Sequence, residues 1–411
     1  MVRALCLASV LAAGCLVRAA LAAGSSCVSC HMNLGEAQAK IIRDFQGDIH
    51  HEAGLSCHSC HGGDPKTEDM ALSMSPDAGF VGKPGPTDMP RFCGKCHSSP
   101  AVMKKYNPAL PVDQESKFWT SHHGMELKKG NAKVAQCASC HLPHSIRKAG
   151  DPLSSVHSKN VAATCAHCHS DKEHMKGSGL PVNQFDKYMK SVHAGALYKK
   201  GDIGAPTCND CHGNHGAQPP GVESIAMICG SCHAHNMELF NGSLMAKAWK
   251  KRGYHACATC HQHHDILQPN LDMLSGKGSV CLECHTPQHK GYQAGAAMKR
   301  GIEEGDAVYS EVTRFIDEVE QKKGMDVAEA RDDIQEGRQA LIQARTAVHG
   351  FDAGKVGEIA SSARNALEKA RTFGQKAARE FWRRRVGLGL STLFITLVVA
   401  GILLKLRDIE K

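Results

Sequence analysis

The sequence has few of the residues that fill an ordinary apolar core. Aromatic side chains make up 5% of its 411 residues, whereas glycine alone contributes 40. That composition is typical of loops and short helices, and it leaves little room for sheet. The chain also lacks spare cysteines, because 18 of the 20 lie in one repeated five-residue pattern. The other two, Cys6 and Cys15, fall in an N-terminal segment that we expect to be removed.

The repeated pattern is Cys-x-x-Cys-His, and it occurs nine times between residues 27 and 285. In each copy the two thiols can form thioethers to one porphyrin, and the adjacent imidazole can bind its iron. Disulfides and paired-cysteine zinc ribbons do not require a histidine after every cysteine pair, so both are poor explanations. The sequence therefore predicts nine covalently attached haem c groups. The attachment cysteines and proximal histidines are Cys27, Cys30 and His31; Cys57, Cys60 and His61; Cys93, Cys96 and His97; Cys137, Cys140 and His141; Cys165, Cys168 and His169; Cys208, Cys211 and His212; Cys229, Cys232 and His233; Cys257, Cys260 and His261; and Cys281, Cys284 and His285.

Nine haems within 259 residues leave about 29 residues for each. Because that is too few for a separate apolar core around each cofactor, the porphyrins themselves are expected to be the core. We predict a three-haem region over 23–118 and a six-haem region over 119–290. The second contains a duplication: Ser121-His-His123 with the motif at Cys137 matches Ser191-Val-His193 with the motif at Cys208. Each copy forms a two-haem module with the motif that follows it.

Histidines outnumber the proximal positions, since 17 of the 26 remain for nine distal sites. Three of them extend a motif to Cys-x-x-Cys-His-x-x-His and would serve a neighbouring haem, because they point away from their own. Others precede a motif by a short loop, and one lies alone in the C-terminal region. The candidate distal ligands are His51, His123, His144, His157, His193, His215, His255, His264 and His349.

Alternatives remain open for several of these histidines. His50, His122 and His263 sit beside favoured candidates, so each of those choices is ambiguous by one position. Any single candidate could instead be a surface histidine, and His349 could cap a helix. Methionine is the rival distal ligand, but the 15 methionines have no recurring relation to the motifs. Packing is the better interpretation of them.

Both ends of the chain indicate export and membrane anchoring. Residues 1–22 resemble a secretory signal peptide, with an apolar run over 4–17 and then Ala20-Leu-Ala22; a lipoprotein signal ending at Cys15 is the alternative. Residues 386–404 carry no charge and are long enough to span a bilayer. We therefore expect the haem region on the periplasmic face of the cytoplasmic membrane and residues 405–411 in the cytoplasm. The triplet Arg383–Arg385 then lies outside, against the positive-inside tendency, which long exported domains override.

Residues 291–385 differ in character from the haem region, with no cysteine and one histidine. Apolar residues recur at three-to-four spacing from Met298 to Val319 and from Val327 to Val348, which predicts long amphipathic helices. Breaks at Lys323-Gly324 and at 350–354 divide them into three. The predicted fold class is mainly α with much loop: a haem-cored multihaem domain, a three-helix C-terminal region and one C-terminal transmembrane helix.

The formal charge of +8 does not describe a haem-loaded protein. Losing the two arginines of the signal, and adding about 18 propionates and one positive charge per ferric porphyrin, gives roughly −3 in the oxidised state. Nucleic acid is therefore not an expected partner.

The blocks from Ser191-Val-His193 through Cys208–His215, with the helical tail, resemble bacterial multihaem cytochromes of the cytochrome c3-like and nitrite-reductase-like superfamily. The resemblance implies closely packed bis-histidine haems, a periplasmic location and electron exchange with quinol-oxidising or terminal reductase complexes. Membrane-anchored quinol-dehydrogenase cytochromes are similar in having one span. Theirs is normally N-terminal and fewer haems follow it.

Two classes of function fit these features. In the first, the protein carries electrons between a membrane quinol-oxidising complex and a periplasmic reductase or cytochrome, as in anaerobic respiration. In the second, one haem keeps an open distal position and acts on a small nitrogen or sulfur compound such as nitrite or hydroxylamine. No Cys-x-x-Cys-Lys motif and no catalytic constellation is present, so no catalytic residue is predicted and the electron carrier is favoured.

Overall fold

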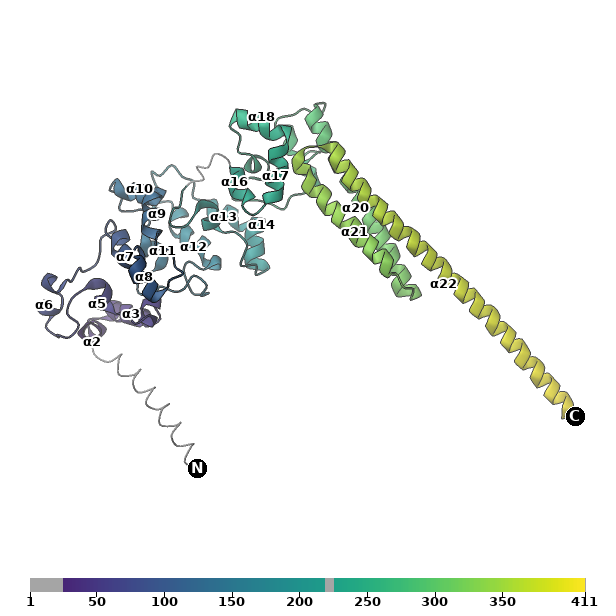
Figure 1. The fold of residues 1–411 in the computed structure, drawn as a ribbon, viewed down its shortest axis with the longest axis horizontal. Helices are drawn as coiled ribbons and strands as arrows, with labels where there is room; N and C mark the ends of the chain where they lie inside the picture. Colours follow the sequence, from purple (N-terminus) through teal and green to yellow (C-terminus); the bar gives the residue numbers. More distant parts are fainter. Residues whose placement is uncertain (1–24, 219–224, 411) are drawn as a thin grey trace. The chain divides into compact units, whose positions relative to one another are not determined.

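The computed structural model describes residues 25–218 and 225–410 (Figure 1). Within these ranges the chain is mainly helical and contains no strand, which confirms the predicted fold class. The expected signal segment, with Cys6 and Cys15, lies outside the described residues.

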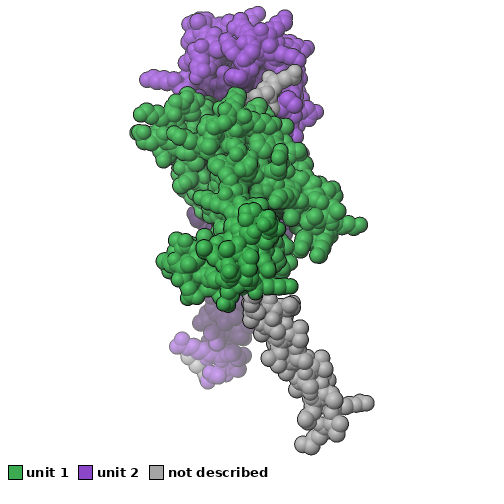
Figure 2. All heavy atoms as spheres, turned by 90° about the vertical axis from the view of Figure 1, so that its left-hand side faces the viewer, with its two compact units in different colours: residues 1–221, 263–267 green, residues 222–262, 268–411 purple. Residues whose placement is uncertain are grey.

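The chain divides into two compact units, coloured separately in Figure 2. Unit 1 comprises residues 1–221 with 263–267, and unit 2 comprises 222–262 with 268–411. The contacts therefore divide the chain near 221, whereas the sequence suggested a division of the haem region near 118. The first six motifs lie in unit 1 and the last three in unit 2.

Unit 1 is built from short helices joined by loops. The described helices are α2 (Ser26–Asn33), α3 (Glu36–Phe45), α4 (Ile49–Glu52), α5 (Cys57–His61), α6 (Met70–Ser73), η1 (Pro76–Ala78), α7 (Met89–His97), α8 (Pro100–Tyr106), α9 (Gln114–Thr120), α10 (His122–Lys128), α11 (Cys137–His141), α12 (Ser158–His169), α13 (Gln184–Met189), α14 (Val192–Ala194), η2 (Gly195–Lys199) and α15 (Cys208–His212). One small apolar cluster, around Ala162, Tyr188 and Ala194, lies in this unit. So small a cluster cannot stabilise a unit of this size alone, which fits a core completed by porphyrins.

Unit 2 combines short helices with three long ones. Its described elements are α16 (Ile225–Gly230), α17 (Ala234–Gly242), α18 (Leu244–Arg252), α19 (Cys257–His261), η3 (Leu271–Met273), η4 (Val280–Glu283), α20 (Lys290–Lys323), α21 (Ala328–Ala347), η5 (Val348–Gly350) and α22 (Ala353–Ile409). Helices α20, α21 and α22 lie side by side as a bundle (Figure 1). The apolar stripes meet at its centre, where Ile302, Ile316 and Leu367 are fully buried.

Small residues bring the three long helices close together. A Cβ atom on Gly337 of α21 would lie 2.7 Å from Cγ of Leu367 on α22, and one on Gly374 would lie 2.4 Å from Cδ1 of Ile316 on α20. Both distances are below ordinary contact, so glycine permits this packing. The helices end where the sequence suggested: Gly324 ends α20 with φ +61°, and the Asp352 carboxylate accepts the backbone N–H groups that start α22.

Helix α22 runs without a break from the bundle into the apolar C-terminal segment. It is the one helix among the described residues that is long and apolar enough to cross a membrane, with a mean hydropathy of 2.3 over its most apolar 18-residue window and none of that window buried. At the start of the segment Arg384 pairs with Glu380 one turn earlier, at 2.9 Å. An apolar helix end of this kind fits membrane anchoring.

Candidate haem-binding site

Four of the attachment motifs fold as single helical turns. Helices α5, α11, α15 and α19 each run from the first cysteine to the histidine of one motif. Three of these helices begin with a capping box. In each, the residue before the first cysteine and the second of the two residues between the cysteines bind each other's backbone N–H groups, as Ser56 and Ser59 do. A helical turn places residues i and i+3 on the same side and i+4 next to them. Both thiols and the imidazole of one motif can therefore reach one porphyrin.

The described cysteines are free thiols, and none forms a disulfide. Cysteines of different motifs nevertheless lie close together in a regular order. Cys93 lies within hydrogen-bonding range of Cys137, and the same close approach joins Cys165 to Cys208 and Cys229 to Cys257. These contacts join the first cysteines of motifs three and four, five and six, and seven and eight.

The second cysteine of motifs two, four and eight lies near cysteines of the next motif. Cys60 is close to Cys96, Cys140 is close to Cys165 and Cys168, and Cys260 is close to Cys281 and Cys284. Cys27 and Cys57 are similarly close and link the first two motifs. Within each unit, motifs that follow one another in the sequence are therefore neighbours in space.

Pairs of histidine rings face one another at a nearly constant separation. An imidazole nitrogen binds a metal ion at about 2.0–2.1 Å, so two rings on opposite sides of one ion have centroids roughly 6.3 Å apart. Six proximal histidines have a partner ring at 6.0–6.2 Å: His50–His97, His61–His144, His123–His169, His141–His215, His212–His264 and His261–His349. This separation fits an iron atom between the rings and is too long for direct stacking.

Burial favours the neutral form of three of these imidazoles, which is the form that binds iron. It lowers the pKa of His123, His141 and His264 to about 4. Within the described ranges no three or more His, Cys, Asp or Glu side chains gather to hold a bare metal ion. The donor set of two facing imidazoles and two nearby thiols therefore fits haem c and not an ordinary metal site.

Five of the nine candidate distal histidines lie opposite a proximal histidine. The three Cys-x-x-Cys-His-x-x-His residues each face the proximal histidine two motifs earlier: His144 faces His61, His215 faces His141 and His264 faces His212. His123 and His349 face His169 and His261. His349 also bonds to the end of α21: its Nδ1 donates a hydrogen bond to the carbonyl oxygen of Thr346 at 2.8 Å.

Three of the other four candidates are placed differently. His50, and not the expected His51, faces His97, while His51 packs edge-on against Phe45 at 5.4 Å. His157 caps α12, its Nδ1 accepting the backbone N–H of Lys159. His255 is exposed before α19. His193 starts α14 in the same position that His123 holds in α10.

A sequence signal could have selected His50 over its neighbour. The buried residues Ser121 and Ser191 lie two positions before His123 and His193, and the buried residue Asp48 lies two positions before His50. All three cap the start of a helix. That shared register identifies His50 as the equivalent of His123 and His193.

The site defines a class of protein: a multihaem c-type cytochrome. Residues 49–170 match the family model described as cytochrome c3. The chain is 26% identical over 162 residues to the cytochrome c-type protein NrfB of Escherichia coli O6:H1 strain CFT073, which covers 38% of this chain and 66% of that protein. The match thus spans just under two thirds of the relative's length. No solved structure matches the chain.

Proposed function

We propose that this protein is a nonahaem c-type cytochrome that carries electrons between a membrane quinol-linked partner and a periplasmic or terminal acceptor. The observation that carries the proposal is the set of six facing histidine pairs at 6.0–6.2 Å. Two imidazoles on one iron leave no position for a substrate, so such haems transfer electrons without binding one. Haem c supplies the one-electron chemistry, and the protein sets its ligands, burial and surrounding charge.

The order of the motifs supports electron transfer along the chain. Cysteine contacts link motifs one to six in unit 1 and seven to nine in unit 2, each to the next in sequence. Attached porphyrins would therefore follow one another within each unit, and short steps between neighbours favour transfer. The resemblance to NrfB, a c-type cytochrome protein by name, supports redox proteins as partners.

Membrane attachment supports a quinol-linked donor. Residues 386–404 of α22 are uncharged and apolar, with their side chains exposed, and the sequence before the first motif resembles an export signal. The proposed location is therefore the periplasmic face of the cytoplasmic membrane, where c-type haems are attached and quinol-oxidising complexes release electrons.

One observation favours the alternative, an oxidoreductase with one open haem. The proximal histidine of the ninth motif, His285, stacks on His289 with ring centroids 4.3 Å apart, which is too close for an iron atom between the rings. His289 also accepts the backbone N–H of Gly291 through Nδ1. If the ninth haem keeps a free position, it is the candidate site for a small nitrogen or sulfur compound.

Spin state and haem count test the proposal together. The purified ferric protein is assayed for haem by pyridine haemochrome and mass spectrometry, and for spin state by electron paramagnetic resonance and resonance Raman. The expected result is nine haems per chain with low-spin iron throughout. One stoichiometric high-spin haem would favour the oxidoreductase and would be assigned by testing whether His285→Ala removes it. A haem count other than nine would contradict the motif assignment.

A further inference from the structure

Three equivalent turns, called joints below, hold His50, His123 and His193 in unit 1. Each consists of a buried cap residue, a middle residue and a histidine: Asp48-Ile49-His50, Ser121-His122-His123 and Ser191-Val192-His193. In each joint, the backbone N–H of the middle residue donates a hydrogen bond to a backbone carbonyl oxygen. That carbonyl belongs to the residue two positions after the last histidine of a Cys-x-x-Cys-His-x-x-His sequence. The three bonds are Ile49 to Ile146 at 2.8 Å, His122 to Ala217 at 2.9 Å and Val192 to Ile266 at 2.8 Å. The first two joints thus tie together histidines that face different proximal histidines, His50 with His144 and His123 with His215.

Two of the three joints use a serine as the cap. The Ser121 hydroxyl donates to the carbonyl of Phe118 at 2.6 Å and accepts the backbone N–H of Gly124 at 2.9 Å. The Ser191 hydroxyl accepts the backbone N–H of Ala194 at 3.1 Å. These hydroxyls cap their helices through backbone bonds, and they carry no charge.

The first joint uses a carboxylate in the same place, and it reaches the histidine ring. Asp48 is 1% exposed. Its Oδ1 accepts the backbone N–H of His50 at 2.8 Å and lies 2.9 Å from Nδ1 of the His50 ring, while its Oδ2 accepts the backbone N–H of Ile146 at 2.7 Å. Because a carboxylate only accepts, the His50 ring must carry its proton on Nδ1. Nε2 is then free to bind iron on the side that faces His97.

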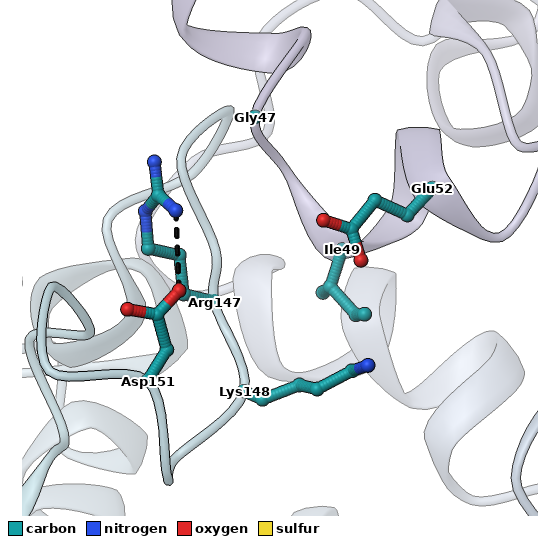
Figure 3. Close-up of a pocket in the computed structure, with 6 residues that line it drawn as sticks. All are labelled: Gly47, Ile49, Glu52, Arg147, Lys148 and Asp151. Atoms are coloured by element: carbon teal, nitrogen blue, oxygen red, sulfur yellow. Dashed lines mark hydrogen bonds and ion pairs between the residues drawn. The ribbon is translucent and has the colours of Figure 1, made fainter.

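Arg147, which lies beside this segment, does not neutralise the carboxylate. Arg147 follows Ile146 in the chain, but its guanidinium pairs with Asp151 at 3.1 Å, as Figure 3 shows beside the segment from Gly47 to Glu52. The charge of Asp48 therefore acts directly on the His50 ring and the two backbone N–H groups that it binds, and at longer range on His144 and Cys60.

We infer that Asp48 is a positioning residue that lowers the reduction potential of the haem attached at Cys93 and Cys96 below that of the haem attached at Cys165 and Cys168. This inference rests on the haem ligation of the proposed function. A buried carboxylate that accepts from the Nδ1–H of a ligating imidazole fixes the ring and makes its other nitrogen more basic. A more basic ligand stabilises ferric over ferrous iron. The haem opposite His123, whose joint has Ser121, receives no such charge.

The test exchanges the caps between equivalent joints. Asp48→Ser makes the first joint like the other two, and Ser121→Asp makes the reverse change. The control is Asp69→Ser, which removes an exposed aspartate that caps α6 by accepting the N–H groups of Ala71 and Leu72. Each protein is titrated against potential, with electron paramagnetic resonance following the low-spin signals. The signal that His50→Gly removes identifies the third haem.

The expected result for Asp48→Ser is about a tenfold increase in the ferrous-to-ferric ratio of the third haem at fixed potential, equal to about +59 mV for one electron. The control should leave every signal in place. An unchanged third-haem potential in a variant with full haem content would overturn the inference, as would an equal shift of all haems.

A second variant covers a failure of Asp48→Ser to fold. Asp48→Asn keeps the volume and one acceptor oxygen but removes the charge, so the third-haem potential should rise in it as well. No rise would overturn the inference. Failure of the proposed function gives a separate result, because it would appear in the unsubstituted protein as a wrong haem count or as high-spin iron.

Discussion

At the scale of the residue, the position of each histidine in its local turn decides its role. His122 and His123 are adjacent, yet His122 is exposed and His123 is half-buried opposite His169. The backbone of His122 makes the bond to Ala217 that holds the turn in place. The side chain of His123 therefore faces a proximal histidine, whereas the backbone of His122 holds the turn in place.

These different roles predict different outcomes for substitutions of His122 and His123. His123→Ala should convert one low-spin haem to high-spin, since it removes the ring on the distal side of His169. His122→Ala is the matched control, because alanine keeps the backbone N–H, and it should leave all haems low-spin. Resonance Raman of the ferric proteins measures both. A low-spin spectrum in His123→Ala would contradict the assignment of this ligand.

At the scale of the element, the two kinds of helix owe their stability to different partners. One-turn helices such as α5 and α15 are too short to persist alone, and capping residues with the attached cofactor are expected to hold them. Helices α20, α21 and α22 bury their own apolar stripes, with Ile316 and Leu367 fully enclosed. The bundle therefore needs no cofactor to pack.

The close helix contacts predict a steric penalty at Gly337. Gly337→Val should destabilise the bundle by about 1–3 kcal/mol, because even its Cβ would overlap Leu367. Gly357→Ala is the matched control: a Cβ there meets nothing within 4 Å, and alanine favours helix by up to about 1 kcal/mol. Thermal unfolding followed by circular dichroism at 222 nm measures the change. Equal midpoints for the two variants would show that the helices do not pack as closely as described.

At the scale of the whole molecule, attachment to the membrane and attachment of haem lie in different parts of the chain. The motifs end at His285, and the apolar segment begins about 100 residues later, within α22. The two properties should therefore separate in a shortened protein.

Ending the chain after Arg385 should release the protein from the membrane without loss of haem, since it removes the only strongly apolar exposed helix segment among the described residues. A chain lacking just residues 405–411 is the control and should stay bound. Carbonate extraction followed by haem staining of the two fractions measures the distribution. A shortened protein that remains in the membrane fraction would point to a second attachment.

The sequence by itself determined the attachment motifs, their proximal histidines and the helical class, because each depends on residues one to four positions apart. It also predicted the bundle helices, whose apolar stripes are local patterns; Met298, Ile302 and Val312 are all buried. Only the tertiary structure decided which distal histidine faces which motif. The facing rings are 46 to 88 residues apart in sequence, from His123–His169 to His261–His349. Their pairing depends on long-range contacts, such as the bond between Ile49 and Ile146, that no local spacing encodes.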